Sequence, residues 1–577
     1  MYPPETSLLP LSVVTSQFVE RHGIRAFTLW FDNWYLGVPF RFIAEPVVPI
    51  LAAMVHKLMP SVSLLGIMIS FAVVSLFLGS VGWSILFSLL SPTQKQRSFI
   101  VFFLLIVVPW RYLDALTLSS LPLTVSRAVL PFVLIAYWRF ISPVQSKTHF
   151  YEYGFLALLG TLSMFLTSIS ITPIFLIGVI SLLVARGFKK GRVRISFLQS
   201  KQISILIALS FLGAVLWYTP RYFQTLIFNP SLGGLTPVSV LTRLYRVLRG
   251  IAPMIAAISF IVLQKSKLSR RNVFTGVWGG TFILITGFRF VSDVDFWMDW
   301  TAWITELEIG LVFVVVSLGV SRKQFKYTAS IALSLIVVSG FVYSALGRPA
   351  LISQAEPDAV SSSFDIVRPH IDSRMFLSGS DTFWSGLMPE VTQVRGGRDS
   401  LATHPYWDHA SYQIREGTDA ELVSLWAQAL GIRYVLVHTA LSDNYYHDFK
   451  TYGKWKDFES VEDDSSGNQL IDTRVESRAW EVNEGILMID PPEKGDDFES
   501  LREYVSYRTN PVALVPSEDG YTLFTSGAQV VQIAVSYDPK WHAYDEVGNE
   551  KRVVSDPLGN IVVFSNGAQE IGFSFEW

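Results

Sequence analysis

The chain contains no cysteine among its 577 residues. Disulfide bonds and thiolate metal sites are therefore excluded, and the redox state of the compartment cannot be read from the sequence. Charged residues are also scarce: they make up 16% of the chain, whereas hydrophobic residues make up 50% and the mean hydropathy is +0.37. This composition is too apolar for an ordinary soluble protein and indicates a membrane protein.

The chain also lacks a strong net charge and the common motifs of soluble enzymes. Its formal net charge of -2 gives no support for a nucleic-acid partner. We find no GxxxxGK(S/T) phosphate loop, no HExxH zinc motif, no GxSxG nucleophile motif and no histidine pair at metal-ligand spacing. The start, MYPPETSLLPLSVV, has neither the basic region nor the apolar core of a cleavable signal peptide.

Long apolar runs are abundant, and they are confined to the first part of the chain. From about residue 43 to 346 apolar runs alternate with short basic loops, whereas the chain from about residue 350 onward is polar and rich in turn residues. A span needs roughly 20 apolar residues, and shorter spans occur where the bilayer thins. The segment 43–60, with its prolines and polar residues, is predicted to be an interfacial helix. The ten predicted spans are 62–90, 98–113, 119–141, 152–169, 171–186, 203–219, 248–264, 273–291, 302–320 and 328–346.

Basic residues in the short loops predict the orientation of these spans. RGFKKGRVRISFLQSK (186–201) carries six basic residues and no acid, QKSKLSRRN (264–272) carries four, and SRKQFK (321–326) carries three. With ten spans these loops fall on one side, which the positive-inside rule assigns to the cytoplasm. The N-terminal 61 residues and the whole C-terminal part are then expected on the opposite side, which indicates a multi-pass protein of the plasma membrane.

Four domains are predicted from these changes in composition. Residues 1–61 form an outer loop with interfacial helices, and 62–346 form the transmembrane helical domain. Residues 347–480 mix helices and strands; DAELVSLWAQALGIRYVLVH (419–438) is typical of an amphipathic helix, a glycine turn and a buried strand. Residues 481–577 contain short alternating segments such as VVQIAVSY and NIVVFS between turns, which predicts a β-sandwich.

Carboxylates beside aromatic residues form the first candidate site. The stretch TLWFDNWYLGVPF (28–40) surrounds Asp32 with aromatic side chains, and SDVDFWMDW (292–300) carries three further aspartates. Such carboxylates can act as a general base or hold a cation, but acids and tryptophans also mark membrane interfaces. The candidate sugar-stacking residues are Trp30, Trp34 and Tyr35, and the candidate metal ligands or second acids are Asp293, Asp295 and Asp299.

Arginines form the second candidate site. TPVSVLTRLYRVLRG (236–250) places Arg243, Arg246 and Arg249 three residues apart, so that on a helix they share one broad face. Guanidinium groups suit phosphate through paired hydrogen bonds, and Arg221 at the end of the preceding span could join them. An amphipathic helix resting on anionic lipid heads explains the same pattern.

A buried arginine is the third candidate. Arg127 in SSLPLTVSRAVLPF is expected roughly 12 Å inside its span, counting about 1.5 Å per residue. An unpaired cation at that depth is costly and usually functional. Asp114 is its candidate partner, so a structural ion pair between spans is the alternative. The same two interpretations apply to Glu306 and Glu308, near the outer end of 302–320.

Several stretches resemble a known group of membrane proteins. They are WFDNWYLGVPF with AEPVVPILAAMVHKLMP, the LPxxxxR pattern of LPLTVSRAVLPF, ALGIRYVLVH, and the terminal YDPKWHAY and GNIVVFSNGAQEIGFSF. Together they are similar to GT-C-type multispanning membrane proteins, and most similar to the group named for a 6-pyruvoyl-tetrahydropterin-synthase-related domain and to YfhO-like membrane proteins. The resemblance covers nearly the whole chain, and no residue supports pterin chemistry.

The resemblance implies a polytopic α-helical membrane domain of GT-C type, with about ten spans, followed by an extracytoplasmic α/β plus β-sandwich part. It implies a glycosyltransferase that takes a sugar from a polyprenyl-phosphate donor and passes it to an extracytoplasmic glycan, lipid or protein. GT-C enzymes carry a catalytic acid in the first outer loop, which here contains Asp32 and Glu5. The arginines expected at the donor phosphate are Arg127, Arg221, Arg243 and Arg246. Relatives have a span before this loop and an aspartate soon after it, where this chain reads PPETSLLPL.

The alternative function is a non-catalytic one: a transporter or flippase, or a scaffold, for lipid-linked saccharides or cell-surface polysaccharide. Transport predicts a polar path, whereas most of the spans offer only Ser, Thr and Gly, with Arg127 as the main exception. A surface protein that needs only an anchor is less well supported, because ten spans exceed that need. The expected partners are the bilayer and a lipid-linked sugar; no cofactor is firmly expected, and a divalent cation such as Mg²⁺ or Mn²⁺ remains an option.

Overall fold

The protein folds into two compact units. The membrane unit comprises Glu45–Thr219 and Pro237–Gln354, and the polar unit comprises Met1–Ala44, Pro220–Thr236 and Ala355–Trp577. The computed structural model describes residues 7–90, 95–108, 111–112, 114–142, 146–189, 192–229, 236–263, 268–292, 303–317, 358–517 and 519–577.

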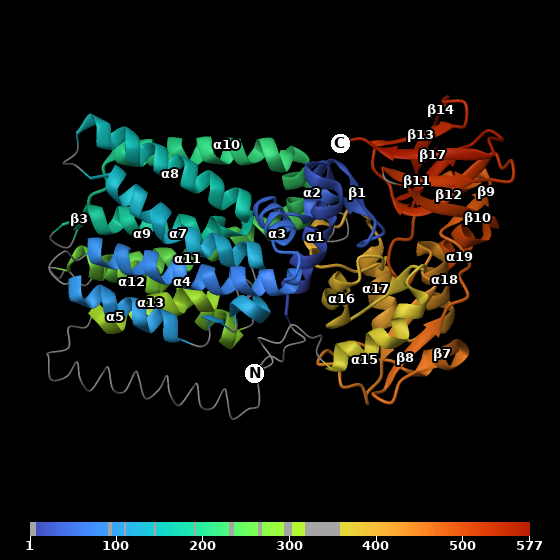
Figure 1. Cartoon of the computed structure of the whole chain (residues 1–577), viewed down its shortest axis with the longest axis horizontal. Coiled ribbons are helices and arrows are strands. Elements are labelled where there is room, and N and C mark those ends of the chain that lie inside the picture. Colours follow the sequence, from blue (N-terminus) through green and yellow to red (C-terminus); the bar gives the residue numbers. More distant parts are fainter. Residues whose placement is uncertain are drawn as a thin grey trace. The chain divides into compact units, whose positions relative to one another are not determined.

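Long helices lie side by side in the membrane unit (Figure 1). Helix α7 packs against α4, α8 and α9, while α12 packs against α9, α11 and α13. A π-helical turn, η4 (Asp114–Leu118), precedes α7. The helices are α3 (Val47–Leu58), α4 (Leu64–Leu90), α5 (Lys95–Val107), α7 (Leu121–Phe140), α8 (Lys147–Thr167), α9 (Thr172–Gly187), α10 (Phe197–Ile227), α11 (Pro237–Leu263), α12 (Arg270–Ser292) and α13 (Ile304–Ser317).

Six of the ten predicted spans are confirmed as helices that are long and apolar enough to cross a membrane. They are Leu64–Leu90, Leu121–Phe140, Lys147–Thr167, Ile169–Gly187, Phe197–Ile227 and Val240–Leu263. The chain is therefore a multi-pass membrane protein.

The other four predicted spans are not confirmed. Helix α5 ends at Val107, short of residue 113, and α13 within 302–320 has only 14 residues. The segment 273–291 lies within α12, a helix of 23 residues that is not among the six. The segment 328–346 lies outside the described residues. The predicted interfacial segment 43–60 forms α3, whose 12 residues are too few to span a bilayer.

Small residues and prolines determine how these helices approach one another. A Cβ on Gly310 of α13 would come within 2.7 Å of the Gly279 Cα in α12, so the absence of side chains allows the close contact. Helix α10 is interrupted at Thr219, whose φ of 64° and ψ of 154° are not helical. Pro220 follows at this break; it has no N–H for a helical hydrogen bond, and it disfavours the helical conformation at the residue before it.

An α/β module forms one part of the polar unit. Its sheet has the order β5-β6-β8-β7, with β5 and β6 parallel and the other pairs antiparallel. The predicted helix, turn and strand of 419–438 are confirmed: the Asp419 carboxylate caps α18, and Gly431 ends it with a φ of 64°. The elements are α15 (Asp358–Val367), β5 (Met375–Phe376), α16 (Asp381–Trp384), α17 (Trp407–Arg415), α18 (Ala420–Leu430), β6 (Tyr434–His438), β7 (Glu459–Asp463) and β8 (Asn468–Asp472).

A β-rich module completes the C-terminal part. Strand β10 pairs with β9 along its first half and with β11 along its second half, so one long sheet folds over at β10. Apolar side chains from both halves fill the core between them, as the alternation in the sequence predicts. Its elements are β9 (Ala479–Val482), α19 (Phe498–Ser506), β10 (Arg508–Ser517), β11 (Gly520–Phe524), β12 (Val530–Ser536), β13 (Trp541–Asp545), β14 (Glu550–Lys551), β15 (Val553–Ser555), β16 (Asn560–Phe564) and β17 (Glu570–Phe575).

The N-terminal segment belongs to the same unit as these two modules. It contains α1 (Leu9–His22), β1 (Trp30–Phe31), β2 (Val38–Pro39) and α2 (Phe40–Ile43). Strands β1 and β2 form a short antiparallel hairpin. The hairpin contains Asp32 and presents it to the C-terminal modules.

Candidate functional site

A cluster of ionisable side chains lies inside the membrane unit, centred on Arg127 of α7. The guanidinium donates two hydrogen bonds to Glu306 of α13, from Nε to Oε1 at 2.8 Å and from Nη2 to Oε2 at 3.1 Å. Its Nη1 donates to Asp114 Oδ2 at 2.9 Å and to Ser119 Oγ at 2.7 Å. The predicted pairing of Arg127 with Asp114 is confirmed, and Glu306 is a second partner.

Asp114 is held from two further directions. The Ser119 hydroxyl donates to its Oδ1 at 2.9 Å, and the Thr305 hydroxyl donates to its Oδ2 at 2.5 Å. The turn η4 places Asp114 directly before α7, while Thr305 and Glu306 begin α13. Three parts of the chain thus meet in a closed network of ion pairs and hydrogen bonds.

Arg111 is a second buried arginine in this region, and it is not among the site residues predicted from the sequence. Its side chain is 4% exposed, and Nη1 donates to Ser80 Oγ and to the Leu105 carbonyl, both at 2.8 Å. Together with Arg127, Ser75, Thr124 and Thr305 it lines a small cavity of about 10 Å³. The signal in the sequence was a basic residue three positions before Asp114, at the end of an apolar run.

Asp32 lies in the polar unit, where it forms ion pairs with two arginines. Its Oδ2 accepts a hydrogen bond from Arg478 Nη1 at 2.7 Å, and its Oδ1 lies 3.7 Å from Arg374 Nη2. Burial alone would raise the pKa of Asp32, but the charges of Arg478 and Arg374 outweigh it and lower the pKa. Burial and the neighbouring Arg478 lower the pKa of Arg374 to about 10. This arrangement stabilises the carboxylate and weakens it as a base.

The aromatic side chains of the same loop are buried among the C-terminal modules. Trp30 packs on Trp541 and on Phe575, each with ring centroids 5.0 Å apart, and it is 7% exposed. Tyr35 is fully buried and donates to Asp399 Oδ1 at 2.7 Å. A sugar in solvent therefore cannot reach these ring faces in this conformation, and the predicted stacking role, which includes the buried Trp34, stays a prediction.

The arginines of 236–250 lie on α11, which is largely exposed within its unit. Arg246 is exposed and Arg243 and Arg249 are half-buried, with Arg249 stacked on Tyr245 at 5.6 Å. Arg221 belongs to the polar unit, where it pairs with Asp538 at 2.5 Å. The predicted phosphate-binding role of these arginines stays a prediction.

Four predicted site residues lie outside the described part of the chain: Glu5, Asp293, Asp295 and Asp299. Among the described residues, no group of three or more His, Cys, Asp or Glu side chains is arranged to hold a metal ion. The predicted divalent-cation site therefore stays a prediction.

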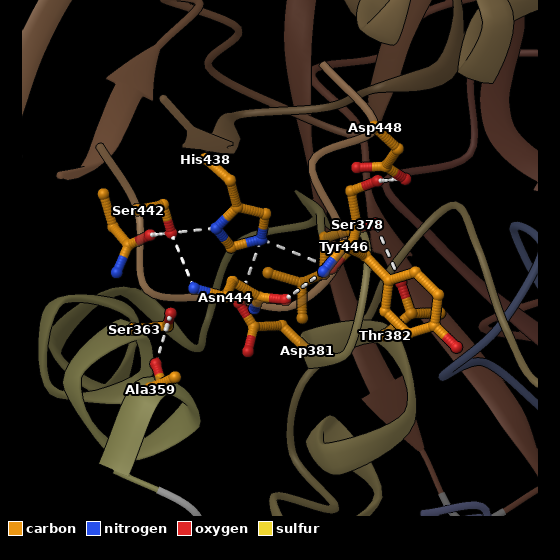
Figure 2. A network of polar contacts seen from close by, with 12 residues as sticks. Ala359, Ser363, Ser378, Asp381, Thr382, His438, Ser442, Asn444, Tyr446 and Asp448 are labelled. Atoms are coloured by element: carbon orange, nitrogen blue, oxygen red, sulfur yellow. Dashed lines mark hydrogen bonds and ion pairs between the residues drawn. The ribbon is translucent and has the colours of Figure 1, made fainter. Parts of the chain in front are cut away.

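A further polar network lies where the parallel strands β5 and β6 end (Figure 2). The fully buried His438 has Nε2 3.1 Å from Asp381 Oδ2, and Nδ1 2.9 Å from Asn468 Oδ1. The Asn468 oxygen also accepts from Ser442, and its amide nitrogen donates to Asp464, which fixes the amide orientation. Both ring nitrogens therefore face acceptors, and His438 is an imidazolium ion.

The electrostatics of this pair agree with its geometry. Burial alone would lower the pKa of His438, but the hydrogen bond and ion pair with Asp381 raise it to about 9. Burial raises the pKa of Asp381, against the opposing effect of His438. Neither side chain is exposed, so the pair lies in the interior of the α/β module.

No known protein family and no curated protein sequence matches the chain. Among solved structures it is similar to the arabinofuranosyltransferase AftD from Mycobacteria, at 11% identity and a TM-score of 0.42, covering 88% of this chain and 41% of that one. A mutant of AftD gives 11% identity and a TM-score of 0.46, with 100% and 59% covered. The Archaeoglobus fulgidus oligosaccharyltransferase gives 11% identity and a TM-score of 0.37, with 75% and 65% covered.

These structural neighbours are glycosyltransferases of the GT-C type, which is the group that the sequence motifs resemble. The narrower YfhO-like group stays a prediction. The chain spans less than two thirds of each of these proteins. At this identity and these TM-scores, a function for the chain has to rest on its own residues.

Proposed function

We propose that the chain is a membrane glycosyltransferase that moves a sugar from a polyprenyl-phosphate donor to an acceptor outside the cytoplasm. The observation that carries the proposal is the cluster of Arg111, Asp114, Arg127 and Glu306, buried among apolar helices beside a small polar cavity. Charged side chains are rare and costly inside membrane helices, and they commonly mark functional sites.

The chemistry of glycosyl transfer explains why such a cluster is useful. An acceptor hydroxyl oxygen attacks the anomeric carbon, the bond from that carbon to the phosphate oxygen breaks, and the electron pair leaves with the lipid phosphate. A carboxylate takes the proton of the hydroxyl, and guanidinium groups stabilise the charge that develops on the phosphate. Arginines held in place by carboxylates are already oriented before the substrate arrives.

The proton acceptor proposed from the sequence is Asp32, with Glu5 as a second carboxylate. In this conformation Asp32 is paired with Arg478 and Arg374, and its lowered pKa makes it a poor base. A role as base therefore requires that the Asp32–Arg478 pair opens when the acceptor binds.

The proposed phosphate ligands differ in their availability. Arg127 already donates to two carboxylates, and Arg221 is paired with Asp538. Arg246 is exposed on α11 among exposed apolar side chains, where a lipid headgroup can approach. We place Arg246 and Arg243 at the entry of the lipid donor, and Arg127 at the reaction centre. The donor sugar and the acceptor, whether glycan, lipid or protein, are left open, as is a divalent cation.

A non-catalytic scaffold for lipid-linked saccharides is the second candidate function. The specific observation in its favour is that Asp32 is neutralised and its aromatic neighbours are buried, which is what a structural loop requires. A scaffold would bind the lipid-linked sugar without releasing lipid phosphate.

The test is a release assay with the purified full chain in nanodiscs and a panel of polyprenyl-phosphate sugars and acceptors. Wild type is compared with Arg127→Gln, Arg127→Lys and Asp32→Asn, and with Arg270→Gln as a control that removes an exposed arginine of the same unit. We expect Arg127→Gln to release lipid phosphate about 100-fold more slowly, because one preorganised charge is lost, and Arg270→Gln to match wild type. Equal rates in folded Arg127→Gln would remove the cluster from the mechanism, and binding without release would favour the scaffold.

A further inference from the structure

Arg111 differs from its neighbour Arg127 in how its charge is balanced. Arg127 forms ion pairs with Asp114 and Glu306 at 2.9 and 2.8 Å. Arg111 forms no ion pair within 4.0 Å among the described residues, and its two hydrogen bonds to those residues go to a hydroxyl and a carbonyl. Its buried Nε has no hydrogen-bond partner there. A buried cation without a paired anion is costly in an apolar environment.

The wall of the adjoining cavity suits an anion. The side chains of Ser75, Thr124 and Thr305 line it together with the two guanidinium groups. The hydroxyls of Thr124 and Thr305 already donate, to the Ser120 carbonyl and to Asp114. Asp114 also lines the cavity, but its charge is met by Arg127 and its two oxygens already accept hydrogen bonds. The cavity therefore offers the positive charge of two guanidinium groups, and the Arg111 Nε–H is a donor without a partner among the described residues.

The size of the cavity limits what can enter it. A volume of about 10 Å³ is close to that of one water-sized group. A whole phosphate group is larger, so the cavity can receive a single oxygen atom of a phosphate that stays outside it.

Glu308 is the carboxylate that competes most strongly for Arg111. It interacts with Arg111 electrostatically, although the two do not approach to ion-pair distance. Both Glu308 oxygens are buried and accept no hydrogen bond from the described residues. Glu308 thus lies near Arg111 without taking up its hydrogen-bond donors.

We infer that Arg111 and its hydroxyl-lined cavity bind one phosphoryl oxygen of a lipid-linked phosphate. The inference rests on the proposed function, since it places the donor's phosphate beside the cluster that would act on it. In this arrangement Arg111 binds the phosphate, whereas Arg127 is held in position by Asp114 and Glu306.

The test is equilibrium binding of a radiolabelled polyprenyl phosphate to the full chain in nanodiscs, without acceptor, so that turnover does not contribute. The variants are Arg111→Gln and Arg111→Lys, with Arg270→Gln as control and Glu308→Gln as the variant that removes the competing charge. Melting followed by tryptophan fluorescence shows which variants are folded. Inorganic phosphate is the second probe, added as a competitor.

We expect Arg111→Gln to bind the lipid phosphate about tenfold or more weakly, as for loss of a charge-assisted hydrogen bond. Arg111→Lys should bind severalfold more weakly, because lysine lacks the guanidinium fork. Arg270→Gln should match wild type, and Glu308→Gln should bind as tightly or more tightly.

Three results would overturn the inference. The first is a folded Arg111→Gln or Arg111→Lys variant that binds as tightly as wild type. The second is Glu308→Gln weakening binding as much as Arg111→Gln, which would make the two a structural pair. The third is that substitution of Arg111 weakens the binding of inorganic phosphate but leaves the binding of the lipid phosphate unchanged. If any of these results occurs while the turnover assay still shows release of lipid phosphate, the inference about Arg111 is wrong and the proposed function stands. If the wild-type chain binds no lipid phosphate, both the inference and the proposed function are wrong.

Discussion

At the scale of single residues, Asp32 connects the N-terminal hairpin to the C-terminal modules. Replacing it with Asn leaves Arg374 and Arg478 near each other without a counter-ion. We expect Asp32→Asn to lower the free energy of unfolding by about 2–4 kcal/mol. This is less than for a fully buried ion pair, because the Asp32 side chain is 21% exposed. The measurement is thermal unfolding of the full chain in nanodiscs.

The same variant separates two roles of this carboxylate. If Asp32 is also the base, release of lipid phosphate at a temperature where Asp32→Asn is folded should fall by a factor of about 10²–10⁴. An unchanged melting temperature would contradict the structural role.

His438 predicts how the stability of the α/β module depends on pH. Its pKa of about 9 in the folded protein lies above the ordinary value of 6.5, so the ion pair with Asp381 contributes fully below pH 6.5. The contribution is lost as the pH rises through about 9. We expect wild type to lose stability between pH 7 and pH 10, and His438→Gln, which carries no titrating ring, to lose less over that interval.

The control for this prediction is His542, a half-buried histidine of the β-rich module that contacts Glu550. His542→Gln should show the wild-type dependence on pH. An identical alkaline loss of stability in wild type and His438→Gln, measured as melting temperature against pH, would show that the buried pair does not cause it.

Charged pairs in this chain could be predicted only in part. Asp114 was a candidate partner for Arg127 because it lies just outside the same apolar run, and the structure confirms the pair. Glu306 could be suspected from its position but not assigned, since its contact depends on how α7 and α13 pack. Arg111 was missed because its role depends on a cavity, which a linear pattern does not reveal.

At the scale of elements, the turn of the N-terminal hairpin is strained. Tyr35, Leu36 and Gly37 have φ values of 57°, 62° and 95°, all in the left-handed region that residues other than glycine rarely adopt. A Cβ on Gly37 would overlap the indole of Trp30. Such strain persists only where the surroundings enforce it.

Gly37→Ala should therefore destabilise the protein by about 1–3 kcal/mol, from strained backbone and displacement of Trp30. The readout is the melting temperature, together with the fluorescence of buried tryptophan. Gly527→Ala is the matched control: it has a φ of 90°, but no atom within 4 Å of the added Cβ. Equal effects of the two substitutions would show that Trp30 packing does not matter.

Helices were easier to predict than their ends. Apolar runs such as that of α4 indicate a span directly, and the glycine turn after α18 indicates where that helix stops. The end of α5 and the close packing of α12 on α13 depend on tertiary contacts, including Gly279 against Gly310. The apolar run 273–291, which contains Arg289, predicts a span, but α12 is not among the six helices that are long and apolar enough to cross a membrane.

At the scale of the whole molecule, the orientation of the chain stays a prediction. The absence of native cysteine makes it directly testable, because each introduced thiol is the only one present. We expect Ser196→Cys, an exposed position in the basic loop 186–201, to react with a membrane-impermeant maleimide only after cells are permeabilised. Ser506→Cys, exposed at the end of α19, should react in intact cells.

Labelling of Ser196→Cys in intact cells, with protection of Ser506→Cys, would reverse the orientation. That result would also place the polar unit in the cytoplasm, where an extracytoplasmic acceptor could not reach it.

The division of the chain into apolar and polar parts follows from composition, and the strands of the β-rich module follow from alternation. Composition did not predict that residues 1–44 share a unit with residues 355–577. That association depends on contacts distant in sequence, such as Asp32 with Arg478 and Trp30 with Trp541. Asp32, expected to be the exposed acid of an active-site loop, is in this conformation half-buried and paired with arginines of the C-terminal modules.

The most direct test of a membrane glycosyltransferase is whether the purified wild-type chain releases polyprenyl phosphate from a sugar-loaded donor only when an acceptor is present. The account predicts acceptor-dependent release with at least one member of the panel, and its loss in a folded Arg127→Gln variant. Release from no donor by a chain that melts cooperatively and binds the lipid phosphate would contradict it.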